Sequence, residues 1–198
     1  LLQQEDYITI VSGLPRSGTS MMMSALQAGG VPLLIDGQRE ADRNNPKGYY
    51  EFAPVKKLTK GQAGWVLSAH GKAVKVISAL LSYLPEDFHY RVIFMERNID
   101  EILASQKRML ERDGIQEENP LDDETLRVEY RAHLETIKDW LESKDWVDAL
   151  YISYNQILRR PMESFLEVDR FLAHKLNVEA MAQVVDPRLY REQEEFGK

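Results

Sequence analysis

Residues 8–20 constrain the fold of this chain more than any other stretch. They read Ile-Thr-Ile-Val-Ser-Gly-Leu-Pro-Arg-Ser-Gly-Thr-Ser. The β-branched and apolar residues before Gly13 predict a buried strand, the Gly/Pro/Ser residues predict a turn, and residues 20–28 predict a helix. A strand, a glycine-containing turn and a helix in this order point several backbone N–H groups into one concavity at the positive end of the helix. The order therefore predicts a cradle for a phosphate-like anion.

The charge in this cradle is not where a nucleoside triphosphate site would have it. Gly13 and Gly18 have the spacing of the two glycines in the loop G-x-x-x-x-G-K-[ST]. Thr19 occupies the place of the lysine, so the side-chain cation that normally reaches the β- and γ-phosphates is missing. A cation is present instead at Arg16, inside the loop and before the second glycine. The sequence therefore predicts the same backbone cradle, with its side-chain cation at Arg16 instead of at the position of Thr19.

Further strands and helices alternate along the rest of the chain. Apolar runs predict strands at residues 73–77, 91–96 and 149–153, with a short additional one at 31–35. Periodic apolar residues predict helices at residues 54–70, 98–112, 124–143, 161–174 and 178–185. This alternation predicts a three-layer, P-loop-like α/β fold with a central, mainly parallel sheet of four or five strands and helices on both faces. A length of 198 residues suits a single domain over residues 1–198.

Composition excludes several classes of protein and site. A net charge of −7 argues against broad attraction to nucleic acid, and no apolar run reaches the roughly 18–20 residues of a transmembrane helix. The acidic residues 1–6 do not resemble a signal peptide. The chain has no cysteine, which excludes thiolate catalysis and disulfides, and we expect a cytoplasmic protein. Its four histidines lack ligand spacing, so we expect no metal.

Ligands of parallel sheets bind at the carboxyl ends of the strands, and polar residues follow these ends here. Arg97 follows the strand at residues 91–96, and Ser105 lies eight residues later, about two helical turns on. An arginine in this place can bind a phosphate with two hydrogen bonds, and a serine hydroxyl can add a third. Arg97 can equally form a structural ion pair with Asp100 or Glu101. Both interpretations are open at this point.

Three stretches of the chain together resemble the sulfotransferase family. Residues 14–20, Leu-Pro-Arg-Ser-Gly-Thr-Ser, are similar to that family's first loop, Pro-[Lys/Arg]-Ser-Gly-Thr-[Thr/Ser]. Arg97 and Ser105 resemble its second motif in spacing and setting. Residues 151–157, which include Tyr154, resemble its Tyr-Glu-Asp-Leu-type stretch, with Asn155 in place of the acid. The resemblance extends over residues 7–172.

The resemblance implies transfer of a sulfuryl group from 3′-phosphoadenosine 5′-phosphosulfate (PAPS), with adenosine 3′,5′-bisphosphate as the product and no metal. It implies that Arg97 and Ser105 bind the 3′-phosphate. Arg16 would stabilise the negative charge that develops on the bridging oxygen as the sulfuryl group leaves. The residues implied in cofactor binding are Arg16, Ser17, Gly18, Thr19, Ser20, Arg97, Ser105 and Tyr154.

The same resemblance suggests a strand lysine and leaves the general base open. Lys75 has the place of the family's lysine near the transferred group, and a buried lysine would be costly without an anion. Many members have a histidine two residues later, where this chain has Ile77. Other branches use a loop carboxylate, for which Asp36 and Glu51 are the candidates. Each of these could instead be a solvated charge or a cap.

The acceptor is not identified by the sequence. We expect an alcohol, phenol or amine on a small molecule, sugar or lipid, held by residues 36–70 and 113–123. Two other functions are compatible with the same loop. One is a degenerate P-loop kinase or NTPase, against which Thr19 argues, and the other is a nucleotide-binding module without catalytic activity. The oligomeric state is likewise open.

Overall fold

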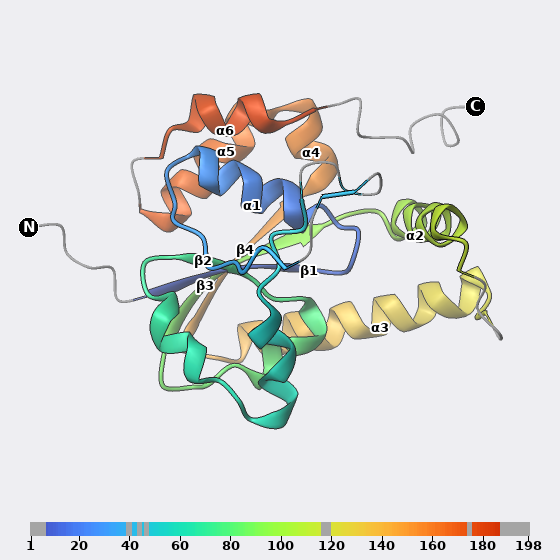
Figure 1. The fold of residues 1–198 in the computed structure, drawn as a ribbon, viewed down its shortest axis with the longest axis horizontal. Coiled ribbons are helices and arrows are strands. Elements are labelled where there is room, and N and C mark those ends of the chain that lie inside the picture. The colour runs from blue at the N-terminus through green and yellow to red at the C-terminus, as the bar shows by residue number, and fades with distance from the viewer. Residues whose placement is uncertain are drawn as a thin grey trace, which may run out of the picture.

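A computed structural model describes residues 7–38, 41–42, 45, 48–115, 120–173 and 176–186. Its centre is a four-stranded, fully parallel sheet with the strand order β2-β1-β3-β4. The strands are β1 (Tyr7–Gly13), β2 (Ala73–Lys75), β3 (His89–Glu96) and β4 (Val147–Ser153). Helices cover both faces of the sheet (Figure 1). The predicted three-layer α/β fold is therefore confirmed, with four strands.

The register of the sheet brings the ends of three strands to one edge. Gly13 at the end of β1 lies opposite Met95, and Glu96 at the end of β3 lies opposite Ser153. The chain leaves each strand at this edge and enters a helix. The loop after β1, the start of the helix after β3 and the start of the helix after β4 are consequently neighbours.

One face of the sheet is covered by α1 (Thr19–Ala28), α4 (Tyr154–Arg159), α5 (Pro161–Leu172) and α6 (Val178–Val184). Apolar side chains of these helices, such as Leu26 and Phe165, pack with Val11, Ile93 and Met95 from the sheet. Alternate residues of β3 point to opposite faces, as the two-residue period of a strand requires. Burial on this side therefore fixes α1, the helix that begins at the predicted cradle.

The opposite face is covered by α3 (Asp123–Glu142) and three 3₁₀ helices, η1 (Ala53–Lys60), η2 (Gly64–Ala69) and η3 (Ser78–Tyr83). Their apolar residues bury Ile8, Ile10 and Phe94 of the sheet. Helix α2 (Ile99–Asp113) follows β3 and, like the beginning of α3, extends beyond the edge of the sheet (Figure 1). None of the helices in the described ranges is both long and apolar enough to cross a membrane.

Three elements differ from the sequence-based expectations. Residues 54–70 form two 3₁₀ helices instead of one helix, because the first ends at Gly61, whose φ of 69° lies in the left-handed region. Residues 31–35 form no strand and contribute one bridge, between Leu33 and Ala73. Strand β2 ends at Lys75, two residues earlier than expected.

Candidate active site

The loop after β1 and the first turn of α1 form the predicted cradle. Gly18 has a φ of 99° and is the residue from which α1 begins. The N–H groups in the first turn of a helix have no partner within the helix, so they are available to an anion. Ser17 lies on the buried side of this loop. Its N–H donates to the carbonyl of Leu14 over 3.1 Å and its side chain is buried, so it closes the turn from below.

The cradle requires glycine because other groups approach its backbone closely. A Cβ atom on Gly18 would lie 2.4 Å from Cδ2 of Tyr154. A Cβ atom on Gly13 would lie 2.7 Å from the carbonyl oxygen of Met95. Tyr154, predicted from the stretch after the fourth strand, therefore packs directly against the loop after the first strand.

Arg16 lies at the bend of this loop and has a φ of 70°, a conformation that non-glycine residues rarely adopt. Its Nε donates a hydrogen bond to Oγ of Ser105 over 3.0 Å. Its backbone carbonyl accepts a hydrogen bond from Nη1 of Arg97 over 2.9 Å. Two residues that follow β3 thus hold both the side chain and the backbone of Arg16.

Arg97 forms one of the ion pairs that the sequence left open and also faces the cavity of the site. Its Nε forms an ion pair with Glu101 at 3.0 Å, which confirms that pairing, whereas Asp100 pairs with Arg127 at 2.6 Å. Its guanidinium carbon lies 4.5 Å from the centre of the Tyr154 ring, and its side chain is 5% exposed. Arg97 nevertheless lines the cavity described below.

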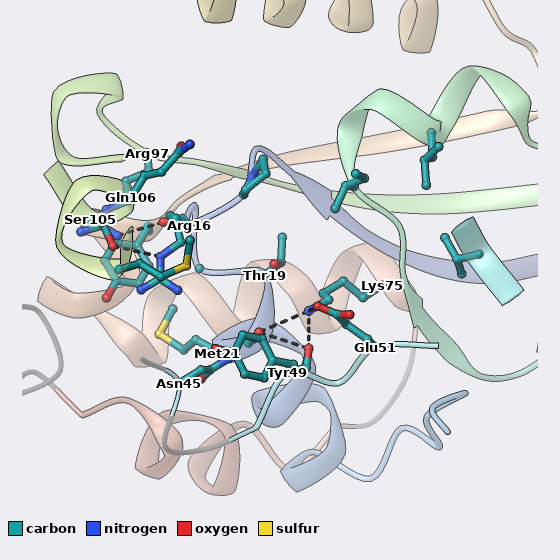
Figure 2. A pocket seen from close by; sticks show the side chains of 18 of the residues that line it. Arg16, Thr19, Met21, Asn45, Tyr49, Glu51, Lys75, Arg97, Ser105 and Gln106 are labelled. Atoms are coloured by element: carbon teal, nitrogen blue, oxygen red, sulfur yellow. Dashed lines mark hydrogen bonds and ion pairs between the residues drawn. The ribbon is translucent and has the colours of Figure 1, made fainter. Parts of the chain in front are cut away.

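Lys75 lies at the other end of the site, with its side chain 9% exposed. Its Nζ donates to Oγ of Ser20 over 3.4 Å and to the carbonyl oxygen of Tyr49, and it lies 4.0 Å from Oε1 of Glu51. Figure 2 shows Lys75 and Glu51 on one side of Thr19, and Arg16, Arg97 and Ser105 on the other. The site therefore has two groups of charged side chains with the cradle between them.

The two candidate carboxylates lie in different environments. Glu51 lines the cavity and forms a second ion pair, with Lys56, at 3.5 Å. Asp36 is not among the lining residues and instead accepts hydrogen bonds from the N–H groups of Ala53 and Gln38, at 2.6 and 3.0 Å. These backbone hydrogen bonds, that of Ala53 above all, lower the pKa of Asp36. Because the N–H of Asp36 also donates to the carbonyl of Glu51, Asp36 holds the segment that presents Glu51.

One cavity of about 520 Å³ joins these parts. Of the residues predicted from the sequence, Ser17 and Asp36 lie outside its lining. The predicted residues that line it are Arg16, Gly18, Thr19, Ser20, Glu51, Lys75, Arg97, Ser105 and Tyr154.

An apolar wall of this cavity was not predicted in residue detail. It consists of Phe52, which precedes η1, Val55 from η1, Ile77, which precedes η3, and Leu80 from η3. Ile77 is 41% exposed although it follows a core strand. An apolar residue beside a strand end, where polar residues were expected, is the sequence signal that could have indicated this wall. Among the described residues, no group of three or more His, Asp or Glu side chains could hold a metal ion.

Three solved sulfotransferase structures share this fold. The sulfotransferase domain from the curacin biosynthetic pathway aligns with a TM-score of 0.52 at 14% identity, over 93% of this chain and 79% of that chain. The sulfotransferase domain from the Synechococcus PCC 7002 olefin synthase aligns with a TM-score of 0.54 at 14% identity, over 98% and 84%. Sulfotransferase STF9 from Mycobacterium avium aligns with a TM-score of 0.51 at 15% identity, over 91% and 67%. At these low sequence identities, the structural alignments show a shared fold and nothing more specific.

The search of curated proteins finds no match. The family profile described as "Sulfotransferase domain" matches residues 6–194, which is nearly the whole chain and includes every residue of the cavity. On this match, the chain belongs to the sulfotransferase family.

Proposed function

We propose that this chain transfers a sulfuryl group from PAPS to a hydroxyl or amine of a small-molecule acceptor, without a metal ion. The observation that supports this most directly is the shared cavity. The cavity joins two separate groups of cations to the cradle, which lacks the lysine of triphosphate-binding loops. One group contains Arg16 and Arg97, and the other contains Lys75. A donor with phosphates at both ends of its ribose and a reactive sulfuryl group matches this distribution of charge.

The donor would be held at two points. Backbone N–H groups at the start of α1, with the hydroxyls of Thr19 and Ser20, would bind the 5′-phosphate. Ser105 and Arg97 would bind the 3′-phosphate from the start of α2. Gly18 has no side chain and lines the cavity, so its backbone faces the space in which the phosphate would lie.

PAPS supplies an activated sulfuryl group, and the side chains around it would direct the transfer. Glu51 accepts the proton of the acceptor as its oxygen or nitrogen forms the new bond to sulfur. The bond from sulfur to the 5′-phosphate oxygen breaks, and its electron pair leaves with adenosine 3′,5′-bisphosphate. Arg16 and Lys75 would stabilise the charge on that oxygen, and a nearly buried cation does so more strongly than one in water.

The wall beside Lys75 and Glu51 favours an acceptor with an apolar skeleton. Phe52, Val55, Ile77 and Leu80 offer no charged group to a substrate, and a partly exposed Ile77 would be covered by one. A hydroxyl-bearing apolar molecule would place its skeleton against this wall and its hydroxyl toward Glu51.

Isothermal titration with adenosine 3′,5′-bisphosphate tests the donor half of this proposal. We expect binding that is clearly tighter than that of adenosine 5′-phosphate, which lacks the 3′-phosphate. No binding at millimolar concentrations of the bisphosphate would contradict the proposal. Thermal stabilisation by ATP with Mg²⁺, in the absence of any effect of the bisphosphate, would instead support a kinase or NTPase. Transfer of radiolabelled sulfate from PAPS to apolar alcohols and phenols tests the acceptor half.

A further inference from the structure

Glu101 is a buried carboxylate that lies behind the site, with 7% of the residue exposed. It accepts a hydrogen bond from Nε of Arg97 over 3.0 Å through one oxygen. Its other oxygen accepts a hydrogen bond from Nδ2 of Asn155 over 2.9 Å. A buried carboxylate is costly unless it is paired and hydrogen-bonded, and here α2 supplies the charge while the end of β3 and α4 supply the donors.

Arg97, the hydrogen-bond partner of Glu101, also connects Glu101 to the cradle. Arg97 donates from Nη1 to the carbonyl of Arg16, the residue with the left-handed backbone at the bend of the loop. The face of the Tyr154 ring lies against the guanidinium and limits the orientations it can adopt. The orientation of Arg97 therefore depends on Glu101, and the bend at Arg16 depends on Arg97.

Asn155 stands where the resembling stretch of the family has an acid. A carboxylate at this position would place two negative charges at about the present separation of 2.9 Å between Oε1 of Glu101 and the side chain of residue 155. Two carboxyls so close cannot both ionise easily, and one takes up a proton. The amide of Asn155 instead donates to Glu101 and leaves its full charge to Arg97.

We propose that Glu101 and Asn155 are positioning residues that act through Arg97 to hold the anion-binding bend at Arg16. Asn155 keeps Glu101 ionised and directed at Arg97, and Arg97 then fixes the loop from which the donor is bound. As far as it concerns the donor, this inference rests on the proposed function. The charged groups that face the pair are Arg97 from the end of β3 and, beyond it, Arg16 on the loop, with Asp100 adjacent on α2.

The variant Asn155→Asp tests this arrangement because it changes one amide to a carboxylate at nearly constant shape. Asn98→Asp is the matched control. Asn98 is exposed and caps α2 by accepting from the N–H of Asp100 over 2.8 Å, so the same change there adds a charge next to Arg97 without facing Glu101. Affinity for the bisphosphate is measured by titration calorimetry at about pH 8 and about pH 6, as a ratio to wild type at each pH.

We expect Asn155→Asp to weaken bisphosphate binding by about tenfold or more at pH 8, and by much less at pH 6, where the facing carboxyls share a proton. Asn98→Asp should stay within about twofold of wild type at both pH values. Binding by Asn155→Asp that equals the control at pH 8, or that is weakened equally at both pH values, would overturn the inference. The second result would mean that the loss does not come from a titrating pair of carboxyls.

The unfolding midpoint of the ligand-free variants gives a readout that does not depend on the donor. We expect Asn155→Asp to be less stable than wild type at pH 8 and to approach it at pH 6. If wild type binds no bisphosphate, the proposed function fails, and the unfolding midpoints alone test the present inference. A loss of stability in Asn155→Asp that is absent, or equal at both pH values, would then overturn the proposed pairing of Asn155 with Glu101. If Asn155→Asp does not fold, the exchange Glu101→Gln/Asn155→Asp should restore folding, and its failure to do so would also overturn the inference.

Discussion

Arg16 and Ser105 are in direct contact, with Nε of the arginine donating to Oγ of the serine over 3.0 Å. The sequence placed these residues at opposite ends of the donor, Arg16 at the 5′ end and Ser105 with Arg97 at the 3′ end. Because they touch, the first loop and helix α2 form one continuous surface. The first two predictions test whether the two residues nevertheless act on different parts of the donor.

Arg16→Ala should lower turnover far more than it lowers bisphosphate affinity. A cation that stabilises charge on the departing oxygen acts in the transition state, and its loss should reduce kcat by about 10²–10³-fold. Steady-state kinetics and calorimetry on the same preparation make the comparison. Arg16→Lys keeps the charge and should recover part of kcat. Equal losses in kcat and in affinity would make Arg16 a binding residue.

Ser105→Ala should weaken bisphosphate binding and leave the binding of adenosine 5′-phosphate nearly unchanged. The hydroxyl contributes one hydrogen bond to a charged group, which is worth about 1.5–3 kcal/mol. Calorimetry with the two nucleotides measures the difference directly. A similar loss for both nucleotides would show that Ser105 acts through its contact with Arg16 and does not bind the 3′-phosphate.

Glu51→Gln should reduce kcat more than Asp36→Asn does. Glu51 lines the cavity, whereas Asp36 is committed to the N–H groups of Ala53 and Gln38. Asp36→Asn should lower the unfolding midpoint as well, because it weakens the anchor of the segment that carries Glu51. Initial rates of sulfate transfer and thermal unfolding of both variants check this. A larger loss of kcat in Asp36→Asn, with its stability unchanged, would reverse the assignment of the base.

Gly18→Ala should be more destabilising than Gly30→Ala. Both glycines have a φ of 99°, so an alanine at either position incurs about 1–2 kcal/mol of backbone strain. Only at Gly18 does the new Cβ meet another group, the Tyr154 ring at 2.4 Å, which adds about 1–3 kcal/mol. Urea unfolding gives both values, and equal destabilisation would contradict the close contact. In a Tyr154→Ala background, Gly18→Ala should be less destabilising than it is in wild type.

His133 should make the stability of the protein fall in mildly acidic solution. Its Nε2 lies 2.8 Å from Oγ of the buried Ser78, and burial lowers the pKa of His133 below 6.5. The unfolded chain therefore takes up a proton first as the pH decreases through about 6.5, and stability declines until the folded protein also titrates. Urea unfolding at about pH 8 and about pH 5.5 measures the decline.

His133→Gln should show a smaller decline in stability than wild type over the same pH interval. His89→Gln is the control because His89 is exposed at the start of β3. An unchanged pH dependence in His133→Gln would show that other groups cause the decline.

The strands and the cradle could be predicted because their signals are local. Continuous apolar runs place β1, β3 and β4 within two residues of their observed bounds, and β1 and most of β3 are buried on both faces. The region of η1 and η2 was predicted as one helix instead of two 3₁₀ helices, because 3₁₀ helices have no distinct apolar period and Gly61 interrupts the chain within it. Contacts between side chains distant in sequence, such as those of Arg16 with Ser105 and of Glu101 with Asn155, follow from the packing of whole elements.

The roles of Asp36 and Glu51 show the same limit within the site. Both are loop carboxylates that follow apolar or aromatic residues, and nothing in their immediate neighbours distinguishes a residue that lines a cavity from one that holds a backbone. The distinction depends on η1, whose first N–H group, that of Ala53, binds Asp36 and turns Glu51 inward. Ser17 shows the same limit of sequence-based prediction. The turn places its neighbours Gly18 and Thr19 in the lining of the cavity, whereas Ser17 is buried outside that lining.

The order of the strands has a consequence for how such a protein can diversify. The groups assigned to the donor come from the ends of β1, β3 and β4, whereas Glu51, Phe52 and Val55 all come from the single stretch of chain between α1 and β2. Mutation, lengthening or replacement of that one stretch can change Glu51 and the part of the apolar wall made by Phe52 and Val55, while Ile77, Leu80 and the residues proposed to bind the nucleotide stay as they are. Selection on the two specificities can therefore proceed separately, and a chimaera that exchanges only this stretch is the natural unit for redesigning the enzyme.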